Sequence, residues 1–425
     1  MKLKSSDWYR NRGYLHFDQQ VGIKAAQAIV TNPKKVARHS FYPMLRYCAF
    51  TIKLGKAPED NSLVKNHKAR EITYASHLDS HIYAYYGKVL ELSYEQILSQ
   101  LNLSNVILAF RRLGKSNVDF AYEAFKEIES RKDCDVIALD ITGFFDNLDH
   151  QHIKDAGAKL LHKDQLPEDH YAVYRSLTRY AYCLRDEIYK EFEISLNNPW
   201  HQRKRICSAY ECRSRVREKE YISINNTDKG IPQGTAISAL LSNIFMLNFD
   251  QKLHSKMNDL GGSYRRYCDD MLFILPKSQQ FDVESFVASE IEAYGLSINS
   301  KKTEKRLFRD GVSNKALQYL GFTYDGKRIL LRSAALARFS EKMNKSIRLV
   351  KNTVDKESKK MGFRVPLRRK KLYERYSHLG HRNFITYGLR ASAVMNSKAI
   401  RKQIKPLWDR LNQKLDEVDQ SAKDQ

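Results

Sequence analysis

The sequence predicts an α+β protein, and three observations lead to this class. The middle of the chain, about residues 130 to 330, mixes short apolar, β-branched runs with stretches of helical periodicity. The last hundred residues repeat their apolar positions at three- and four-residue steps, as amphipathic helices do. With 42% hydrophobic residues in 425, the chain can bury one large core or two to three domains.

The charge of the chain indicates a polyanionic partner. Its 73 lysines and arginines exceed its 49 aspartates and glutamates, for a formal net charge of +24. From residue 327 onward there are 26 basic against 9 acidic residues, so less than a quarter of the chain carries most of the excess. Since nucleic acids are the commonest polyanions that such proteins meet, we expect nucleic-acid binding, with the C-terminal helices as its main surface.

The remaining composition favours the cytoplasm. Six cysteines without regular spacing do not form a disulfide framework and suit a reducing compartment. The first ten residues, MKLKSSDWYR, lack the apolar region of a secretory signal. The longest uncharged run, residues 230 to 249, contains proline, glutamine, serine and asparagine, so we expect no membrane span.

The periodicity predicts the elements in chain order. The first 130 residues read as mostly helix, most clearly over residues 119–128, and residues 134–139 read as a buried strand. A loop with Gly230, Pro232 and Gly234 leads into one long helix from Ile237. Residues 264–275 read as two strand segments broken at 268–270, and the basic piece 201–219 reads as an insertion. From residue 327 onward the pattern is helical, with the apolar stripe Leu336, Phe339, Met343, Ile347 and Val350.

Three carboxylates stand where strands are expected to end. Asp140 follows the run VIAL directly, and Asp269 and Asp270 occupy the tip of the expected hairpin. If these strands are neighbours, the carboxylates cluster and need a cation, and oxygen ligands favour Mg²⁺ or Mn²⁺ over zinc. Two such ions about 3.5 to 4 Å apart could clamp the oxygens of a phosphoryl displacement. The alternative is that these are ordinary acids at strand ends.

Two other site patterns are weaker. Cys207 and Cys212, with His201 nearby, have no second metal-binding pair, so we do not expect a zinc site. The triplet Gly114-Lys115-Ser116 lacks the earlier glycine of a phosphate-binding P-loop, so we reject that motif.

Five segments in succession resemble the palm motifs of reverse transcriptases, and bacterial ones above all. They are LDITGFFDNLDH (139–150), KGIPQGTAISALLSN (229–243), YCDD (267–270), LSINSKKT (296–303) and YLGF (319–322). Each string is weak alone, but the order of all five is that of the family. The resemblance implies a right-hand polymerase with fingers, an antiparallel palm sheet and a helical thumb.

The resemblance also implies roles for the carboxylates. Asp140 and Asp269 match the family's metal-holding aspartates, Asp270 matches the third acid of the cluster, and Ile141 would lend only its backbone carbonyl. The expected cofactor is a pair of Mg²⁺ ions, with Mn²⁺ as the alternative. Asp146 and Asp149 are expected to be local turn or helix-start residues.

Further roles follow from the same match. Phe145 falls at the family's sugar gate, where a ring excludes the ribose 2′-hydroxyl and selects dNTPs; the alternative is that Phe144 and Phe145 both belong to the core. Gln233 matches the glutamine that contacts the incoming nucleotide. Lys302 matches the lysine beside the departing pyrophosphate, with Lys301 as the alternative register.

The match implies two more sets of contact residues, one for the triphosphate upstream of the palm motifs and one for the primer near the end of the palm. Basic residues of the finger motifs would hold the triphosphate, and the candidates are Arg70, Arg111 and Lys115. Tyr319, Leu320 and Gly321 would form the primer grip, although a plain core strand fits these three nearly as well.

The expected division of the chain follows these motifs. We expect an N-terminal helical extension over 1–60, fingers over 61–130, a palm over 131–325 with an insertion near 160–225, and a basic helical thumb over 326–425.

The expected function is RNA-directed synthesis of cDNA from dNTPs. The residues after 322 are enough for a helical thumb but too few for an additional RNase H, maturase or endonuclease domain. The chain most resembles the free-standing, defence-associated reverse transcriptases of type 2. That class implies a structured non-coding RNA as template and a role against phage; the sequence does not identify the RNA, the primer or protein partners. The alternatives are a template-independent or protein-primed DNA polymerase of the same fold, and a catalytically inactive RNA-binding module.

Overall fold

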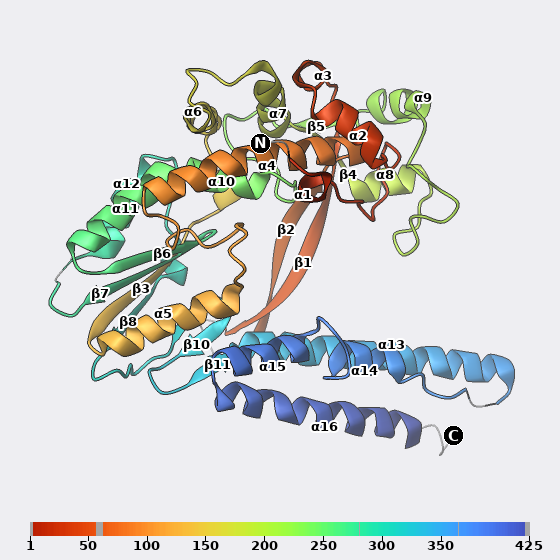
Figure 1. Cartoon of the computed structure of the whole chain (residues 1–425). Coiled ribbons are helices and arrows are strands. Elements are labelled where there is room, and N and C mark those ends of the chain that lie inside the picture. The colour runs from red at the N-terminus through yellow and green to blue at the C-terminus, as the bar shows by residue number, and fades with distance from the viewer. Residues whose placement is uncertain (1–2, 57–62, 280, 364, 421–425) are drawn as a thin grey trace. The chain divides into compact units, whose positions relative to one another are not determined.

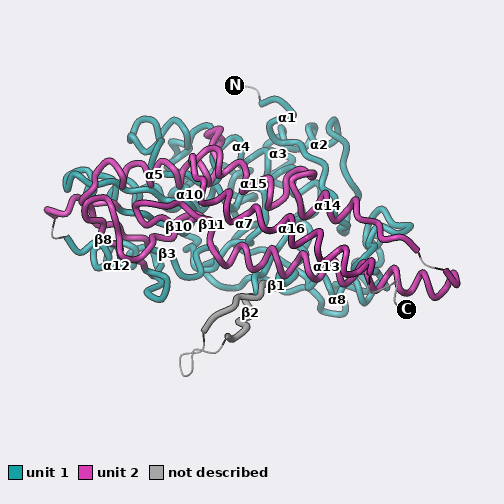
Figure 2. The backbone as a smooth tube through the Cα atoms, turned by 90° about the horizontal axis from the view of Figure 1, so that it is seen from below, with its two compact units in different colours: residues 1–111, 139–273, 281–303 teal, residues 112–138, 274–280, 304–425 magenta. Residues whose placement is uncertain are grey.

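The computed structural model describes residues 3–56, 63–279, 281–363 and 365–420. It forms two compact units: unit 1 comprises residues 1–111, 139–273 and 281–303, and unit 2 comprises 112–138, 274–280 and 304–425 (Figure 2). Helices and antiparallel sheets occur together (Figure 1), which confirms the predicted α+β class and is consistent with a right-hand polymerase. The four-part division into extension, fingers, palm and thumb stays a prediction.

Unit 1 begins with short helices and a long hairpin. The helices are α1 (Ser5–Trp8), α2 (Ile23–Val30) and α3 (Pro33–Ala37), and the hairpin strands are β1 (Met44–Lys56) and β2 (Leu63–Tyr74). The two strands pair antiparallel with Leu45 opposite Tyr74, in a sheet of order β2-β1-β4-β5 that also holds β4 (Ala181–Leu184) and β5 (Ser223–Ile224). The mostly helical interpretation of the first 130 residues is therefore wrong over this hairpin.

A 24-residue helix, α4 (His77–Gln100), follows the hairpin. Ser76 caps its N-terminus by accepting a hydrogen bond from the backbone N–H of Asp79. The helix buries residues almost all round its first half, from His77 to Gly87. It is therefore a core helix, which explains why its periodicity in the sequence is weak.

The second sheet carries the predicted strands. Its order is β6-β7-β3-β8, from β6 (Ser263–Tyr267), β7 (Asp270–Pro276), β3 (Cys134–Asp140) and β8 (Glu304–Phe308). Strand β3 pairs antiparallel with β8, from Cys134 opposite Phe308 to Ala138 opposite Glu304. The strand expected over 134–139 and the hairpin broken near 268–270 are thus present.

Helices connect these strands. They are α6 (His150–Leu160), α7 (Glu168–Thr178), α8 (Arg185–Glu191), α10 (Ser238–Phe245), α11 (Leu247–Asp259) and α12 (Val283–Glu292). The one long helix expected from Ile237 is divided at Met246 into α10 and α11. Asp149 caps α6 by accepting from the backbone N–H of His152 at 2.7 Å, as its helix-start assignment predicts.

The basic piece 201–219 folds onto a core of its own. It contains α9 (Ala209–Glu211) and a π-helical turn (Cys212–Arg217). Ile206, Cys207 and Val216 from this piece pack in a buried cluster with residues such as Leu15 and Phe17 near the N-terminus. The insertion is therefore an integral part of unit 1.

Unit 2 combines a small sheet with five helices among its described residues. The sheet has the order β11-β10-β9, from β9 (Leu317–Tyr319), β10 (Phe322–Tyr324) and β11 (Ile329–Leu331). The helices are α5 (Asn117–Arg131), α13 (Ser333–Met361), α14 (Lys370–Tyr376), α15 (Phe384–Val394) and α16 (Lys398–Gln420). In α13 the buried residues are Phe339, Met343 and Ile347, which confirms the core of the predicted stripe.

No helix within the described ranges combines the length and the apolar character needed to span a membrane.

Candidate active site

Asp140 ends strand β3 in a largely buried position. Its residue exposure is 9%, and its backbone carbonyl accepts a hydrogen bond from the N–H of Asn299 at 2.7 Å. The Lys302 ammonium lies 2.5 Å from Oδ2 of Asp140. The segment around residues 299–302 therefore closes over the end of β3 and brings a cation to its carboxylate.

Asp269 reaches the same place from the β6–β7 hairpin. The backbone N–H of Ile141 donates to the carbonyl of Asp269 at 3.2 Å, so the end of β3 lies directly beside this turn. Asp269 is half-buried, whereas Asp270, the first residue of β7, is exposed and is followed by the buried Met271. The structure thus brings Asp140, Ile141 and Asp269 together, as predicted from strands that are neighbours.

The turn that carries Asp269 has a strained backbone. Cys268 has a φ of 62°, in the left-handed region that non-glycine residues rarely adopt. Burial, together with the neighbouring Asp269 carboxylate, raises the pKa of the Cys268 thiol. The thiol therefore stays protonated at neutral pH, which agrees with a packing role for this side chain.

A buried ion pair between Arg266 and Asp250 stabilises this turn. Arg266 is fully buried, and its guanidinium makes a two-pronged contact with Asp250, from Nε to Oδ1 at 2.7 Å and from Nη2 to Oδ2 at 2.6 Å. Nη1 of Arg266 donates to the carbonyl of Cys268 at 3.1 Å. The guanidinium thus holds the residue whose strained backbone sets the position of Asp269.

Other side chains complete the polar cluster around Arg266. Asn243 accepts from Nη1 at 3.1 Å, and the Tyr264 hydroxyl donates to Oδ1 of Asp250 at 2.8 Å. Burial lowers the pKa of Arg266, but the Asp250 carboxylate more than offsets this and the net shift is upward. The pair therefore stays charged, and its many hydrogen bonds offset the cost of burying it.

The donor set fits a divalent cation that prefers oxygen ligands. No three or more histidine, cysteine or acidic side chains lie close enough to hold a metal ion in the parts of the chain that the structure describes. Magnesium, however, is usually bound by one or two carboxylates, with substrate phosphates and water supplying the rest. Asp140, Asp269 and the Ile141 carbonyl provide such a partial set, and Lys302 places a positive charge there.

Phe145 lies on a loop that the GIPQG segment holds in place. Its carbonyl accepts from the N–H of Ile231 at 3.0 Å. Gly230 has a φ of 85°, and a Cβ there would lie 2.8 Å from the carbonyl oxygen of Asp146, so this close approach requires glycine. Phe144 is buried and Phe145 is half-buried, so only Phe144 belongs fully to the core.

Gln233 lies against the base of the β1–β2 hairpin. Its carbonyl accepts from the N–H of Thr73 at 2.9 Å, and its side chain is half-buried. A Cβ on Gly234, whose φ is 128°, would lie 2.8 Å from the Thr73 carbonyl oxygen. The structure therefore joins the loop of Gln233 to the segment expected to be fingers.

The predicted triphosphate contacts have different surroundings. Arg70 is exposed on β2. Lys115 lies in unit 2 and pairs with Glu123 at 2.5 Å. Lys301 is exposed beside Lys302, and only Lys302 has an ion pair with Asp140 among the described contacts.

Arg111 does not fit the role expected for it. Its side chain is 2% exposed, and Nε and Nη2 contact the Glu95 carboxylate at 2.8 and 2.6 Å. Its Nη1 donates to the carbonyls of Ser104 and Ile107. Because these contacts engage the whole guanidinium, Arg111 stabilises the loop after α4 and is not available to a triphosphate.

The expected primer-grip residues form a tight turn in unit 2. Leu320 and Gly321 join β9 to β10, and both have positive φ, at 45° and 95°, as in a type I′ hairpin. The amide of Asn117 donates to the Leu320 carbonyl at 2.9 Å. Tyr319 is buried whereas Leu320 and Gly321 are half-buried, so the accessible part of this motif is the turn itself.

Sequence reasoning missed the cluster of Arg266, Asp250, Asn243 and Tyr264. One signal was available: in the strand SYRRY, alternation places Arg266 on the same face as the apolar position Tyr264. A basic residue on the buried face of a strand needs an acidic partner, although the partner on α11 could not be named from spacing.

Residues 183–324 match the model of the reverse transcriptase (RNA-dependent DNA polymerase) family. The match includes Gln233, Asp269, Asp270 and Lys302, and Asp140 and Phe145 precede it. It confirms the sequence-based recognition of a reverse transcriptase, a family that generally uses divalent metal ions.

A curated relative and two solved structures also resemble the chain. The retron Se72 reverse transcriptase of Salmonella heidelberg (strain 579083-10) is 29% identical over 98 residues, which are 22% of this chain and 25% of that protein. The chain therefore aligns with about a quarter of that relative's length. Telomerase from Candida albicans, in complex with a fragment of telomeric RNA, matches 91% of this chain and 64% of its own at 12% identity and a TM-score of 0.39. The RNA-dependent RNA polymerase of a human picobirnavirus matches 88% and 55%, at 11% identity and a TM-score of 0.42.

Proposed function

We propose that the whole protein is an RNA-directed DNA polymerase that copies a structured partner RNA into cDNA. The premise is the match of residues 183–324 to the reverse transcriptase family. The observation that carries this proposal is the junction of Ile141 with Asp269, because it sets two acids and a backbone carbonyl side by side. The retron relative and the net charge of +24 support an RNA template.

The proposed chemistry is the transfer of a nucleotide to a primer 3′-hydroxyl. Asp140 and Asp269 would hold Mg²⁺, as two ions, or Mn²⁺, which would neutralise the triphosphate and activate the hydroxyl. Lys302 carries a proton at Nζ, 2.5 Å from Asp140, and would give it to the departing pyrophosphate or neutralise its charge. Asp270, exposed beside Asp269, would add negative charge to the site.

Selection of the substrate would fall to the loops around these acids. The half-buried Phe145 ring would exclude a ribose 2′-hydroxyl, and Gln233 would contact the incoming dNTP. Arg70 and Lys115 stay candidates for the triphosphate, and the Leu320-Gly321 turn for the primer. In this proposal the partner RNA is a non-coding RNA and the cDNA serves antiphage defence in the bacterial cytoplasm.

Primer extension tests the polymerase. The purified protein is given an RNA template annealed to a DNA primer, with Mg²⁺ and either all four dNTPs or one. Asp269→Asn should abolish extension, whereas Asp164→Asn, the same change at an exposed aspartate elsewhere, should leave it intact. Products that follow the template support the proposal; incorporation of a single dNTP regardless of template, or DNA bound covalently to the protein, would replace it by the untemplated or protein-primed alternative.

A second experiment tests the partner. RNA and DNA that copurify with the protein from its native host are sequenced for wild type and for Asp269→Ala with Asp270→Ala. One RNA enriched in both preparations, with complementary DNA only in wild type, is expected. Bound RNA without cDNA in either preparation would leave an RNA-binding module.

A further inference from the structure

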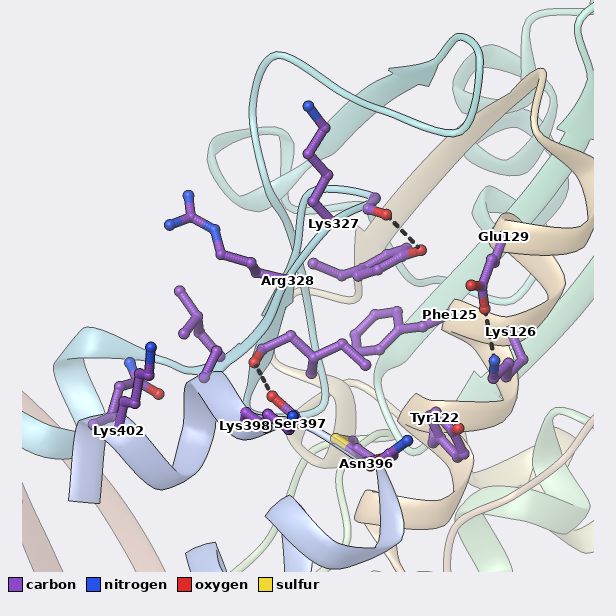
Figure 3. A pocket seen from close by; sticks show the side chains of 17 residues that line it. Tyr122, Phe125, Lys126, Glu129, Lys327, Arg328, Asn396, Ser397, Lys398 and Lys402 are labelled. Atoms are coloured by element: carbon purple, nitrogen blue, oxygen red, sulfur yellow. Dashed lines mark hydrogen bonds and ion pairs between the residues drawn. The ribbon is translucent and has the colours of Figure 1, made fainter. Parts of the chain in front are cut away.

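A pocket of about 820 Å³ lies within unit 2, remote in sequence from the YCDD turn. Three segments line it: helix α5, the β10–β11 turn, and the α15–α16 connection with the start of α16 (Figure 3). Its volume lies in the upper part of the range of about 300 to 1,000 Å³ that small-molecule sites occupy. It therefore has room for a ligand larger than one small metabolite.

The lining is strongly basic. It contains Lys126, Lys327, Arg328, Lys398 and Lys402 against one acid, Glu129. Glu129 neutralises Lys126 at 2.8 Å, and Asp325 lies 3.5 Å from Arg328 in an exposed, weak pair.

Three of these lysines have no counter-charge. Lys327, Lys398 and Lys402 are exposed and have no ion-pair partner among the described residues. They come from two segments, a turn and a helix, that the fold brings to one cavity. Like charges at one cavity repel each other, so the cavity favours an anionic ligand with several charges.

Aromatic side chains form the α5 side of the pocket. Phe125 is 1% exposed and stacks on Tyr324 with ring centroids 4.8 Å apart. Tyr122, one helical turn before, is half-buried and faces the pocket in Figure 3, with Lys126 5.6 Å from its ring centre. A half-buried ring beside lysines offers a stacking surface for a nucleobase whose phosphates the lysines neutralise.

The opposite wall is rigid. Gln403 accepts from the N–H of Leu331 at 2.9 Å and donates to its carbonyl at 3.2 Å. The Ser397 hydroxyl donates to the Ile329 carbonyl at 2.7 Å. These bonds fix the start of α16 against β11, so Lys398 and Lys402 are presented from a fixed backbone. Asn396, with a φ of 47°, is exposed at the mouth and offers both a donor and an acceptor.

We propose that this pocket binds a single-stranded segment of the template RNA, with its phosphates on Lys327, Lys398 and Lys402 and a base on Tyr122. This inference rests on the proposed function and adds a second RNA site to it. The pocket lies at the β10–β11 turn, whereas the expected primer grip is the β9–β10 turn at the other end of β10, so the two sites are distinct. The chain would thereby hold its RNA at a point where no synthesis occurs.

The geometry favours single-stranded RNA over its competitors. A duplex hides its bases in the stack and could not reach a half-buried ring, whereas loops and ends can splay a base into a pocket. An acidic peptide would use the lysines but not the ring. The Asn396 amide suits a base edge or a 2′-hydroxyl, which DNA lacks.

Binding of a fluorescein-labelled U12 RNA, followed by anisotropy at several KCl concentrations, tests the proposal. The variant with Lys327→Ala, Lys398→Ala and Lys402→Ala should weaken binding at least about tenfold. It should also reduce the slope of log affinity against log salt by about 2, since each phosphate contact contributes about 0.7. The control with Lys24→Ala, Lys34→Ala and Lys163→Ala removes the same charge from exposed positions of unit 1 and should change affinity less than about twofold. An equal loss of U12 affinity in both triple variants would contradict RNA binding at the pocket.

Substitutions of Tyr122 test base stacking separately from the charge of the pocket. Tyr122→Ala should weaken U12 binding about tenfold and Tyr122→Phe less than about twofold, because stacking needs the ring and not the hydroxyl. RNA carrying 5-iodouridine should cross-link to the α5 segment under ultraviolet light. A Phe variant as weak as the Ala variant, or cross-links confined to other segments, would overturn the stacking role.

Competitors identify the ligand class. Unlabelled single-stranded RNA should displace U12 more strongly than T12 DNA, an RNA duplex or UMP; displacement by UMP at equal affinity would make the pocket a mononucleotide site and overturn the proposal. Asp269→Asn should bind U12 like wild type. If the proposed polymerase function is wrong, only primer extension will therefore contradict it. If the proposed RNA pocket is wrong, only the U12 binding measurements will contradict it.

Discussion

Two groups of basic residues in this protein differ in how their charge is neutralised. Around the YCDD turn, Arg266 is fully buried and its guanidinium makes four hydrogen bonds to the chain's own groups, two of them to the buried carboxylate of Asp250. Around the pocket of unit 2, Lys327, Lys398 and Lys402 are exposed and unpaired among the described residues. A cation that is neutralised internally shapes the chain, whereas one that is left uncompensated is available to a partner.

The comparison also explains why residue type alone misleads. Arg111 was expected to hold a triphosphate because it lies in a basic motif, but Glu95 and two carbonyls engage it. Whether an arginine is structural or available depends on its partners, and these lie elsewhere in the sequence.

The largest expected effect comes from breaking the buried pair. Arg266→Met leaves the Asp250 carboxylate buried without its cation and should lower the free energy of unfolding by about 3 to 5 kcal/mol. Chemical denaturation measures this loss, and Arg265→Met, at the neighbouring position of the same strand, is the matched control with a smaller expected effect.

The double variant separates charge from packing. Arg266→Met with Asp250→Leu should recover most of the stability, because no unpaired charge is left. Its primer extension should stay low, since nothing then holds the Cys268 carbonyl. Full activity in the stable double variant would contradict the positioning role of Arg266.

A second variant disturbs the same region without any change of charge. Gly234→Ala places a Cβ 2.8 Å from the Thr73 carbonyl oxygen at a φ of 128°, and should cost about 1 to 3 kcal/mol. The displacement of the Gln233 loop should raise KM for dNTPs in primer extension. Gly13→Ala, where a Cβ meets nothing within 4 Å, should leave both stability and KM unchanged; an equal effect of the two variants would exclude the steric explanation.

A third variant should increase binding at the pocket. Glu129→Gln releases Lys126 from its ion pair and should strengthen U12 binding about two- to threefold, a gain on the scale of an exposed pair. Glu123→Gln, on the same helix as Glu129, releases Lys115, which lies outside the pocket lining, and should have less effect. Weaker binding in Glu129→Gln would show that the carboxylate itself contributes to the site.

The smallest expected effect concerns the thiol of Cys212, which is neither fully buried like Arg266 nor exposed like the pocket lysines. A hydrogen bond from Cys207 and the nearby Arg217 and Arg213 lower the pKa of Cys212 to about 7, against the opposing effect of burial. The alkylation rate of Cys212 by iodoacetamide should therefore rise with pH through about 7 and level off above it. Mass spectrometry follows the modified peptide.

Removing the donor tests the cause. Cys207→Ala should raise the pKa of Cys212, so its alkylation at pH 7 should slow and its profile should move to higher pH. An unchanged profile would show that the arginines alone set this pKa.

The sequence predicted elements whose signal is local. Strand β3, the β6–β7 hairpin, helix α5 and the stripe of α13 follow from periodicity over ten to twenty residues, and the adjacency of Asp140 and Asp269 followed from them. The β1–β2 hairpin was missed because its stability comes from pairing across 12 residue positions and from β4, about 135 residues later in the chain.

The unpredicted part of the site has the same origin. The cluster around Arg266 joins residues from α10, α11 and β6, and the pocket joins segments that begin near residues 122, 324 and 395. Their charges can be counted in the sequence, but their pairing depends on contacts between distant segments. Only the fold separates the neutralised cations from the available ones.

The left-handed backbone at Cys268 determines which amino acids this position tolerates. A β-branched residue would be strongly disfavoured there, and glycine or asparagine would relieve the strain at the cost of a looser turn. Cysteine brings a thiol next to a proposed catalytic acid, yet burial raises its pKa and keeps it protonated. Thiol-directed reagents should therefore spare this centre and react instead at cysteines such as Cys212, whose pKa is lowered to about 7.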